Sequence, residues 1–201
     1  MRYSEQHKAR THERVLKKAA EQMCRRGVEG TGIASLMGKV GLTHGGFYTH
    51  FPDKDALIAE AAGPMLEDGV AEVIAAAEAA PEGKKVRAIV DTYLSPQHRD
   101  SRQVCPVAGL AGEMARQSQT VRNAYTCAIE DRLKLIAGFL SGANERERRD
   151  RARLMMSGMA GTMMLAKVVT DREASDRFLE QAREFYASVF EAAPGQKYKR
   201  A

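Results

Sequence analysis

The stretch from Gly41 to Leu57 reads GLTHGGFYTHFPDKDAL and decides how the first part of the chain folds. It opens with residues typical of a tight turn between helices, because Gly41 tolerates a left-handed backbone and Thr43 can cap the helix that follows. That helix must be short, since Pro52 can neither continue a helix nor donate its N–H. The spacing therefore predicts two helices joined by a tight turn.

The sequence before this turn predicts two more helical segments. Apolar residues at helical spacing predict a first helix from Ser4 to Arg26, which Gly27 is suited to end. A second, short helix carries the apolar residues between Ile33 and Val40. Three helices with a tight turn between the second and third form a helix-turn-helix, whose third helix lies in the major groove of DNA.

The rest of the chain predicts longer amphipathic helices, so the expected fold is all-α with about nine helices. Pro64 lies inside the first of these helices and predicts a kink or a break there. We expect residues 1–54 to form a helix-turn-helix DNA-binding domain and residues 55–201 to form a helical ligand-binding and dimerisation domain. The predicted helices of that second part span 54–79, 83–98, 105–117, 119–141, 145–169 and 173–191.

The formal net charge of +5 is confined to the first 54 residues. These hold ten basic and five acidic residues, whereas the remaining 147 residues hold 21 of each. Such an asymmetry favours a polyanionic partner for the N-terminal part. Statistical scatter over a short segment is the alternative explanation.

Several classes of function are excluded by the composition. No apolar run approaches the 18 residues needed to span a bilayer, and the N-terminus has no secretory apolar region. Cys24, Cys105 and Cys127 form no CxxC pair. Leu16 stands where a zinc-binding helix beginning at His12 would need its second histidine, so no metal site is expected. We expect a cytoplasmic protein that is not an enzyme and has no cofactor.

The segments 33–37 and 41–57 together resemble the DNA-binding region of TetR-type (TetR/AcrR) transcriptional regulators. The family pattern is Gly-(Leu/Val)-(Thr/Ser)-x-Gly-x-(Phe/Leu)-Tyr-x-His-Phe-x-x-Lys-x-x-Leu, and it covers about a quarter of this chain. Met37 departs from it, because helix-turn-helix proteins commonly place alanine there; an unbranched side chain can bend aside. The resemblance implies a homodimeric repressor that binds a palindromic double-stranded DNA operator and is released by a small apolar or amphipathic effector.

Residues on or beside the third helix are the expected DNA contacts. The resemblance implies that Tyr48 and Lys54 contact phosphate, although Lys54 could equally be a solvated charge. Gly45 and Gly46 are costly in a helix and would let the backbone approach DNA, unless they merely begin a poor helix. The N-terminal arm, with Arg2 and Tyr3, could add contacts in the minor groove. The full predicted set is Thr31, Thr43, His44, Gly45, Gly46, Tyr48, Thr49, His50 and Lys54.

Two further sets belong to the second part of the chain. Apolar stripes on the last two helices predict a dimer interface, unless the stripes face only their own core. They comprise Leu154, Gly158, Gly161, Leu165, Phe178, Ala182, Phe185 and Val189. The candidate residues for binding an unknown effector are Met65, Tyr93, Leu110, Met114, Tyr125, Met155 and Met159.

Two alternatives stay open for how the protein acts. An activator or an architectural protein without a ligand is the alternative within DNA binding. A regulator switched by oxidation or by electrophiles is the alternative for the signal, because Cys105 stands at a predicted helix start, where the pKa of a thiol falls. A buried and unreactive Cys105 is the plainer interpretation.

Overall fold

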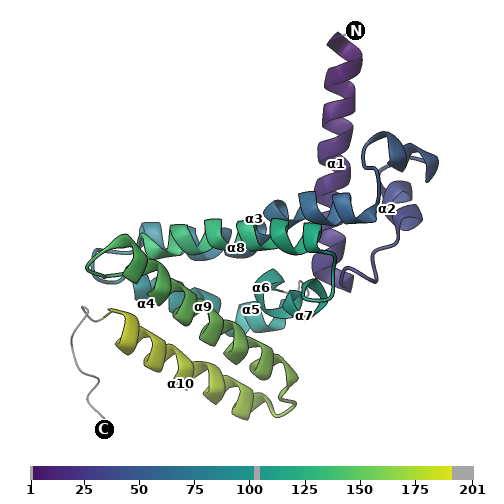
Figure 1. The fold of residues 1–201 in the computed structure, drawn as a ribbon. Helices are drawn as coiled ribbons and strands as arrows, with labels where there is room; N and C mark the ends of the chain where they lie inside the picture. The colour runs from purple at the N-terminus through teal and green to yellow at the C-terminus, as the bar shows by residue number, and fades with distance from the viewer. Residues whose placement is uncertain (1, 102–104, 192–201) are drawn as a thin grey trace. The chain divides into compact units, whose positions relative to one another are not determined.

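The computed structural model describes residues 2–101 and 105–191, and every regular element in these ranges is helical (Figure 1). The all-α prediction is confirmed. Within these ranges, none of the helices combines the length and apolarity needed to cross a membrane. The elements are α1 (Arg2–Arg26), α2 (Ile33–Lys39), the 3₁₀ helix η1 (Gly45–Thr49), α3 (Lys54–Ala79), α4 (Lys85–Tyr93), α5 (Pro96–Asp100), α6 (Pro106–Gly109), α7 (Ala111–Met114), α8 (Gln119–Ala137), α9 (Glu145–Val168) and α10 (Arg172–Glu191).

Local capping signals set several of the helix ends. Gly27 follows α1 with φ +77°, and its N–H donates to the carbonyl four residues earlier at 2.9 Å. Asp53 Oδ1 accepts a hydrogen bond of 2.8 Å from the amide three residues on, at the start of α3. Asn144 accepts one of 2.9 Å in the same way at the start of α9. These caps explain why the end of α1 and the starts of α3 and α9 agree with the prediction, whereas α8, predicted to reach residue 141, ends at Ala137.

The helix predicted over 83–98 is divided into α4 and α5. Ser95 has an extended backbone, and its hydroxyl accepts a hydrogen bond of 3.1 Å from the N–H of His98. Pro96 then occupies the first helical position, where its missing N–H costs nothing. A cap and a proline therefore begin a new helix where the apolar periodicity alone predicted a continuous one.

The helix predicted over 105–117 is also divided, into the four-residue helices α6 and α7 on either side of Leu110. Gly109 and Gly112 lie in this segment, and each lowers helix stability by about 1 kcal/mol relative to alanine. Two glycines in so short a stretch outweigh its apolar periodicity.

Of the kink or break predicted at Pro64, the break does not occur, because α3 runs without interruption through it. Pro64 removes one hydrogen bond to the preceding turn, but the residues around it hold the helix in place. Ala61, Ala62, Met65 and Leu66 are all buried in the core on either side of the proline. Packing therefore offsets the missing hydrogen bond.

The chain divides into two compact units, and the first comprises Met1–Gly69 and Arg102–Ile129. Its core joins α1, α2, η1 and the start of α3 to side chains from α7 and α8. The boundary predicted after residue 54 separates a DNA-binding domain from a ligand-binding domain. The compact units are defined by packing and not by function, so that boundary stays a prediction. The buried side chains of this core include Met23, Leu36, Phe47, Phe51, Leu57, Leu110, Met114 and Val121.

The second unit comprises Val70–Ser101 and Glu130–Ala201, and α9 and α10 lie side by side in it (Figure 1).

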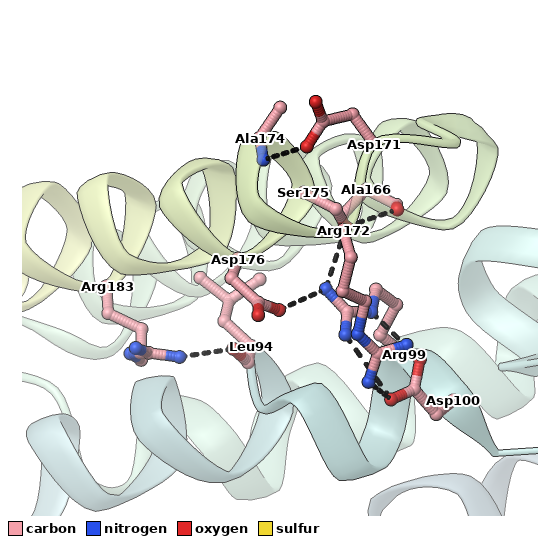
Figure 2. A network of polar contacts seen from close by, with 10 residues as sticks. All are labelled: Leu94, Arg99, Asp100, Ala166, Asp171, Arg172, Ala174, Ser175, Asp176 and Arg183. Atoms are coloured by element: carbon pink, nitrogen blue, oxygen red, sulfur yellow. Dashed lines mark hydrogen bonds and ion pairs between the residues drawn. The ribbon is translucent and has the colours of Figure 1, made fainter.

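Arg99 of α5 is the main buried charge of the second unit, with a side chain only 4% exposed. The guanidinium donates to Ser175 Oγ at 2.8 Å and pairs with Asp176 at 2.5 Å, as Figure 2 shows. Arg99 and Arg172 both bind Asp100 and lower the pKa of its carboxyl to about 2. This polar network fastens α5 to the start of α10.

Candidate nucleic-acid interface

The turn between α2 and η1 has the geometry that the sequence predicts. Gly41 takes a left-handed backbone with φ +73°, and the N–H of Leu42 donates to the Met37 carbonyl at 2.9 Å. The third helix of the motif is the five-residue 3₁₀ helix η1, and not an α-helix. Two glycines at its start and Pro52 after its end leave too few good helix formers for a longer α-helix.

Two phenylalanines determine which side of η1 faces the core. Phe47 and Phe51 are both fully buried, and their rings stack with centroids 5.5 Å apart. Met37 of α2 is also fully buried, and its Cε lies 3.9 Å from the position that a Cβ on Gly46 would take. The bulky residue at position 37 is therefore accommodated beneath η1. With this side of η1 held in the core, the opposite side faces outward.

The outward side carries a row of polar and aromatic side chains, which we call the η1 row: Thr43, His44, Gly45, Tyr48 and Thr49, all exposed. The Thr43 hydroxyl accepts a hydrogen bond of 3.2 Å from the N–H of Gly46, and the Thr49 hydroxyl donates to the Gly46 carbonyl at 2.7 Å. Tyr48 is 58% exposed, and its ring meets that of His44 edge-on at 5.9 Å. Five predicted DNA-contacting residues thus share one surface.

The glycines of η1 are not required by the protein's own packing. A Cβ on Gly45 would meet no atom within 4 Å, and one on Gly46 would make only ordinary contacts of 3.6 and 3.9 Å. Neither glycine has a left-handed backbone. Helix propensity therefore disfavours both residues, and no internal contact compensates for them. Because they have no Cβ, these residues leave the main chain of η1 unshielded by side chains of their own, which permits close approach by a ligand.

The other predicted contacts are placed differently. Thr31 is buried, and its hydroxyl donates to the Gly27 carbonyl at 2.9 Å, so the side chain is engaged inside the protein. Lys54 is half-buried at the first residue of α3. His50 is half-buried directly after η1. The η1 row therefore has Lys54 and His50 close to it in sequence, whereas Thr31 lies on the interior side of the module.

A histidine pair lies beside the end of η1. His12 of α1 bonds Glu60 of α3 at 2.7 Å and stacks on Phe51 with ring centroids 4.5 Å apart. His50 lies 6.0 Å from His12, between ring centroids, and its Nδ1 is buried without a hydrogen-bond partner in the described part of the chain. Burial, followed by the charges of His12 and Lys8, lowers the pKa of His50. His50 is therefore held neutral more strongly than a free histidine.

The predicted dimerisation residues lie on α9 and α10 of the second unit. Leu154 is 70% exposed and Leu165 57% exposed, and Gly161, Phe178 and Phe185 are also exposed. The half-buried members are Gly158, Ala182 and Val189. A Cβ on Gly158 would collide with the hydroxyl of Tyr186 on α10, so this glycine serves contact within the unit. Leu154, Leu165, Phe178 and Phe185 give these two helices exposed apolar surface.

The predicted ligand-binding residues are all buried. Met65, Leu110, Met114 and Tyr125 belong to the first compact unit, and Tyr93, Met155 and Met159 to the second. A hollow of about 300 Å³ in the second unit is lined by none of them, but by residues from the start of α4, from 138–141 and from the end of α10. Their role in binding a ligand stays a prediction.

Two contacts that involve the helix-turn-helix segment have no local signal in the sequence. The Arg14 guanidinium donates to the Val40 carbonyl at 2.5 Å, which ties α1 to the end of α2. Glu113 accepts a hydrogen bond of 2.7 Å from the N–H of Val28. The partners are 26 and 85 residues apart, so only the folded chain brings them together.

Comparisons with known proteins give one family match and several similar folds. The model of the family "Bacterial regulatory proteins, tetR family" matches residues 15–61. The reduced form of Escherichia coli NemR is similar with a TM-score of 0.72 and 18% identity, over 92% of this chain and 98% of that one. A TetR transcriptional regulator from Chloroflexus aurantiacus J-10-FL gives 0.68 and 24%, over 91% and 95%. One from Agrobacterium tumefaciens gives 0.69 and 16%, over 92% and 100%. No curated protein matches the chain significantly.

Proposed function

We propose that this chain, a TetR-type regulator in its DNA-binding region and its fold, is a ligand-responsive repressor that binds a palindromic operator as a homodimer. The predicted resemblance to this family is confirmed for residues 15–61. The observation that carries the proposal is the η1 row, which is exposed and includes backbone at Gly45 that no internal contact covers. A surface of that kind suits close approach to a nucleic acid.

In the η1 row and at Lys54 beside it, the chemistry of each side chain indicates which part of DNA it would contact. The Tyr48 phenol and the Lys54 ammonium suit phosphate oxygens, which position a protein on DNA without selecting sequence. Thr43, His44 and Thr49 can exchange hydrogen bonds with base edges in the major groove. The row contains no arginine to pair with guanine, so we expect these uncharged side chains to select the operator and the basic residues to supply affinity.

Dimerisation is the second part of the proposal. A palindrome presents two half-sites about 34 Å apart, so two copies of η1 must be held at that spacing. The exposed apolar side chains on α9 and α10 support a pairing of these helices between two chains. Leaving Leu154, Leu165, Phe178 and Phe185 in water would be unfavourable for a monomer, since each apolar Å² buried contributes about 25 cal/mol.

The signal is the third part. Effector binding would favour a conformation with wrongly spaced η1 helices and so lower operator affinity. Buried methionines such as Met65, Met114, Met155 and Met159 support an apolar or amphipathic effector, because the thioether side chain adapts its shape. As for location, we expect the protein in the cytoplasm with its operator.

A thiol switch through Cys105 is the alternative signal. It rests on the position of Cys105 directly before Pro106, the first residue of α6. Cys105 is 4% exposed and precedes a helix of only four residues, so an oxidant reaches it only after local opening. A Cys105→Ser variant that loses its response to peroxide or to N-ethylmaleimide while still binding DNA would favour this alternative.

A salt titration tests the proposed DNA binding. Duplexes from the region upstream of the protein's own gene are compared with a scrambled duplex by fluorescence anisotropy. A specific dimer binds the cognate duplex on the order of 10³-fold or more tightly than the scrambled one, with an affinity that falls steeply with salt. A ratio near one would contradict the proposal and favour an architectural protein.

A further inference from the structure

The turn that follows α1 encloses a carboxylate from a distant part of the same compact unit. Glu113 Oε2 accepts hydrogen bonds from the N–H groups of Val28 at 2.7 Å and of Glu29 at 3.3 Å. Gly27 precedes these two amides with φ +77°. Successive amides after a left-handed residue form a concave anion site, and here the anion is the side chain of Glu113.

The turn and the carboxylate fit each other closely. A Cβ on Gly27 would lie 2.5 Å from Oε1 and 2.9 Å from Oε2 of Glu113, so only glycine leaves room for the carboxylate. On the other side of the turn, the Thr31 hydroxyl donates to the Gly27 carbonyl at 2.9 Å. The position of the residues between α1 and α2 therefore depends on Glu113 as well as on the local sequence.

Glu113 belongs to a segment with little helical stability of its own. It lies in α7, which has four residues and follows the four-residue helix α6. Helices of this length make few hydrogen bonds, and Gly109 and Gly112 weaken them further. Segments of low local stability are the parts of a protein that move most readily when a ligand binds. A marginal segment thus holds the turn from which α2, and after it η1, departs.

We propose that Glu113 is a positioning residue for DNA binding, whose carboxylate holds the α1–α2 turn in the geometry that operator binding needs. Displacement of α7 withdraws the carboxylate, leaves the Val28 and Glu29 amides without their anion and lets α2 shift on α1. A ligand that displaces α7 therefore lowers operator affinity, and by linkage the operator holds α7 in place. This inference rests on the proposed function, because its readout is operator binding.

Glu113→Gln tests the charge, and Glu67→Gln is the matched control, since Glu67 is an exposed carboxylate on α3 of the same unit. We expect Glu113→Gln to weaken operator binding about tenfold, within the usual range of coupling between sites. Its salt dependence should stay as in the wild type, because no phosphate contact is lost. Amide exchange at Val28 and Glu29 should accelerate. The control should change none of the three.

A second pair of variants tests the fit of the turn even if Glu113→Gln folds poorly. Gly27→Ala places a methyl group against the carboxylate and also strains the left-handed backbone, so its unfolding midpoint should fall. In a Glu113→Ala background the collision is removed and only the strain remains. Gly27→Ala should then lower the midpoint less than it does in the wild type. An equal drop in both backgrounds would overturn the proposed fit.

The outcomes separate this inference from the proposed function. If the wild-type protein shows no preference for its operator, the proposed function fails. If it does, and Glu113→Gln binds the operator equally well while exchange at Val28 and Glu29 accelerates, the positioning role is overturned.

Discussion

Replacing Gly45 with alanine should strengthen the fold and weaken DNA binding. The added methyl meets no atom within 4 Å, and the backbone of Gly45 is not left-handed. Gly→Ala at a compatible site stabilises by about 0.4–1 kcal/mol, chiefly by restricting the unfolded chain. For a chain of this size, that raises the unfolding midpoint by about 1–4 °C. The same methyl occupies space at which the DNA surface would lie, and we expect operator affinity to fall at least about tenfold, or 1.4 kcal/mol.

Thermal unfolding and anisotropy binding on the same preparations measure both effects. Gly38→Ala is the control, because a Cβ on Gly38 of α2 also meets nothing within 4 Å and lies outside the η1 row. It should stabilise to a similar extent and leave operator affinity unchanged. The reasoning is refuted if Gly45→Ala binds the operator as tightly as the wild type, or if it lowers the unfolding midpoint.

Three further predictions concern pH, assembly and stability. The pKa of folded His50 lies below its usual 6.5, so the unfolded chain takes up a proton first as the pH falls. The free energy of unfolding should therefore decrease as the pH drops from about 6.5 through that lowered pKa. In urea unfolding at several pH values, this free energy should depend less on pH in His50→Gln. Leu165→Glu should give a monomer in sedimentation with its helix content retained, and a stable dimer would contradict the proposed interface. Arg99→Met should cost about 2–3 kcal/mol in urea unfolding, since it removes a buried hydrogen-bonded guanidinium. Arg87→Met, which removes a more exposed ion pair, should cost no more than about 1 kcal/mol, and equal costs would refute the argument from burial.

The parts of the fold that sequence predicts well are those with local causes. The ends of α1 and α3, the left-handed Gly41 and the buried Phe47 and Phe51 all follow from caps, a turn glycine and apolar spacing within a few residues. Each of these signals lies beside the feature it produces. The helix-turn-helix and most of the η1 row could be assigned from them.

The parts that sequence did not predict depend on residues far apart in the chain or on small differences in helix stability. Pro64 predicted a kink or a break, but buried neighbours from the core keep α3 continuous. Nothing in the sequence indicated that Thr31, whose DNA contact stays a prediction, is buried with its hydroxyl donating to the Gly27 carbonyl. Glu113 gave no signal at all, because its partners at Val28 and Glu29 precede it by more than eighty residues.

The central claim is that the η1 row contacts DNA, and amide spectra of the isotopically labelled protein test it most directly. Titration with a cognate duplex should shift the amide signals of Thr43 to Thr49 and of Lys54 most strongly, with saturation at one duplex per dimer. A scrambled duplex at the same salt should shift them weakly. Strong shifts confined to other helices, with the η1 row unchanged, would contradict the account.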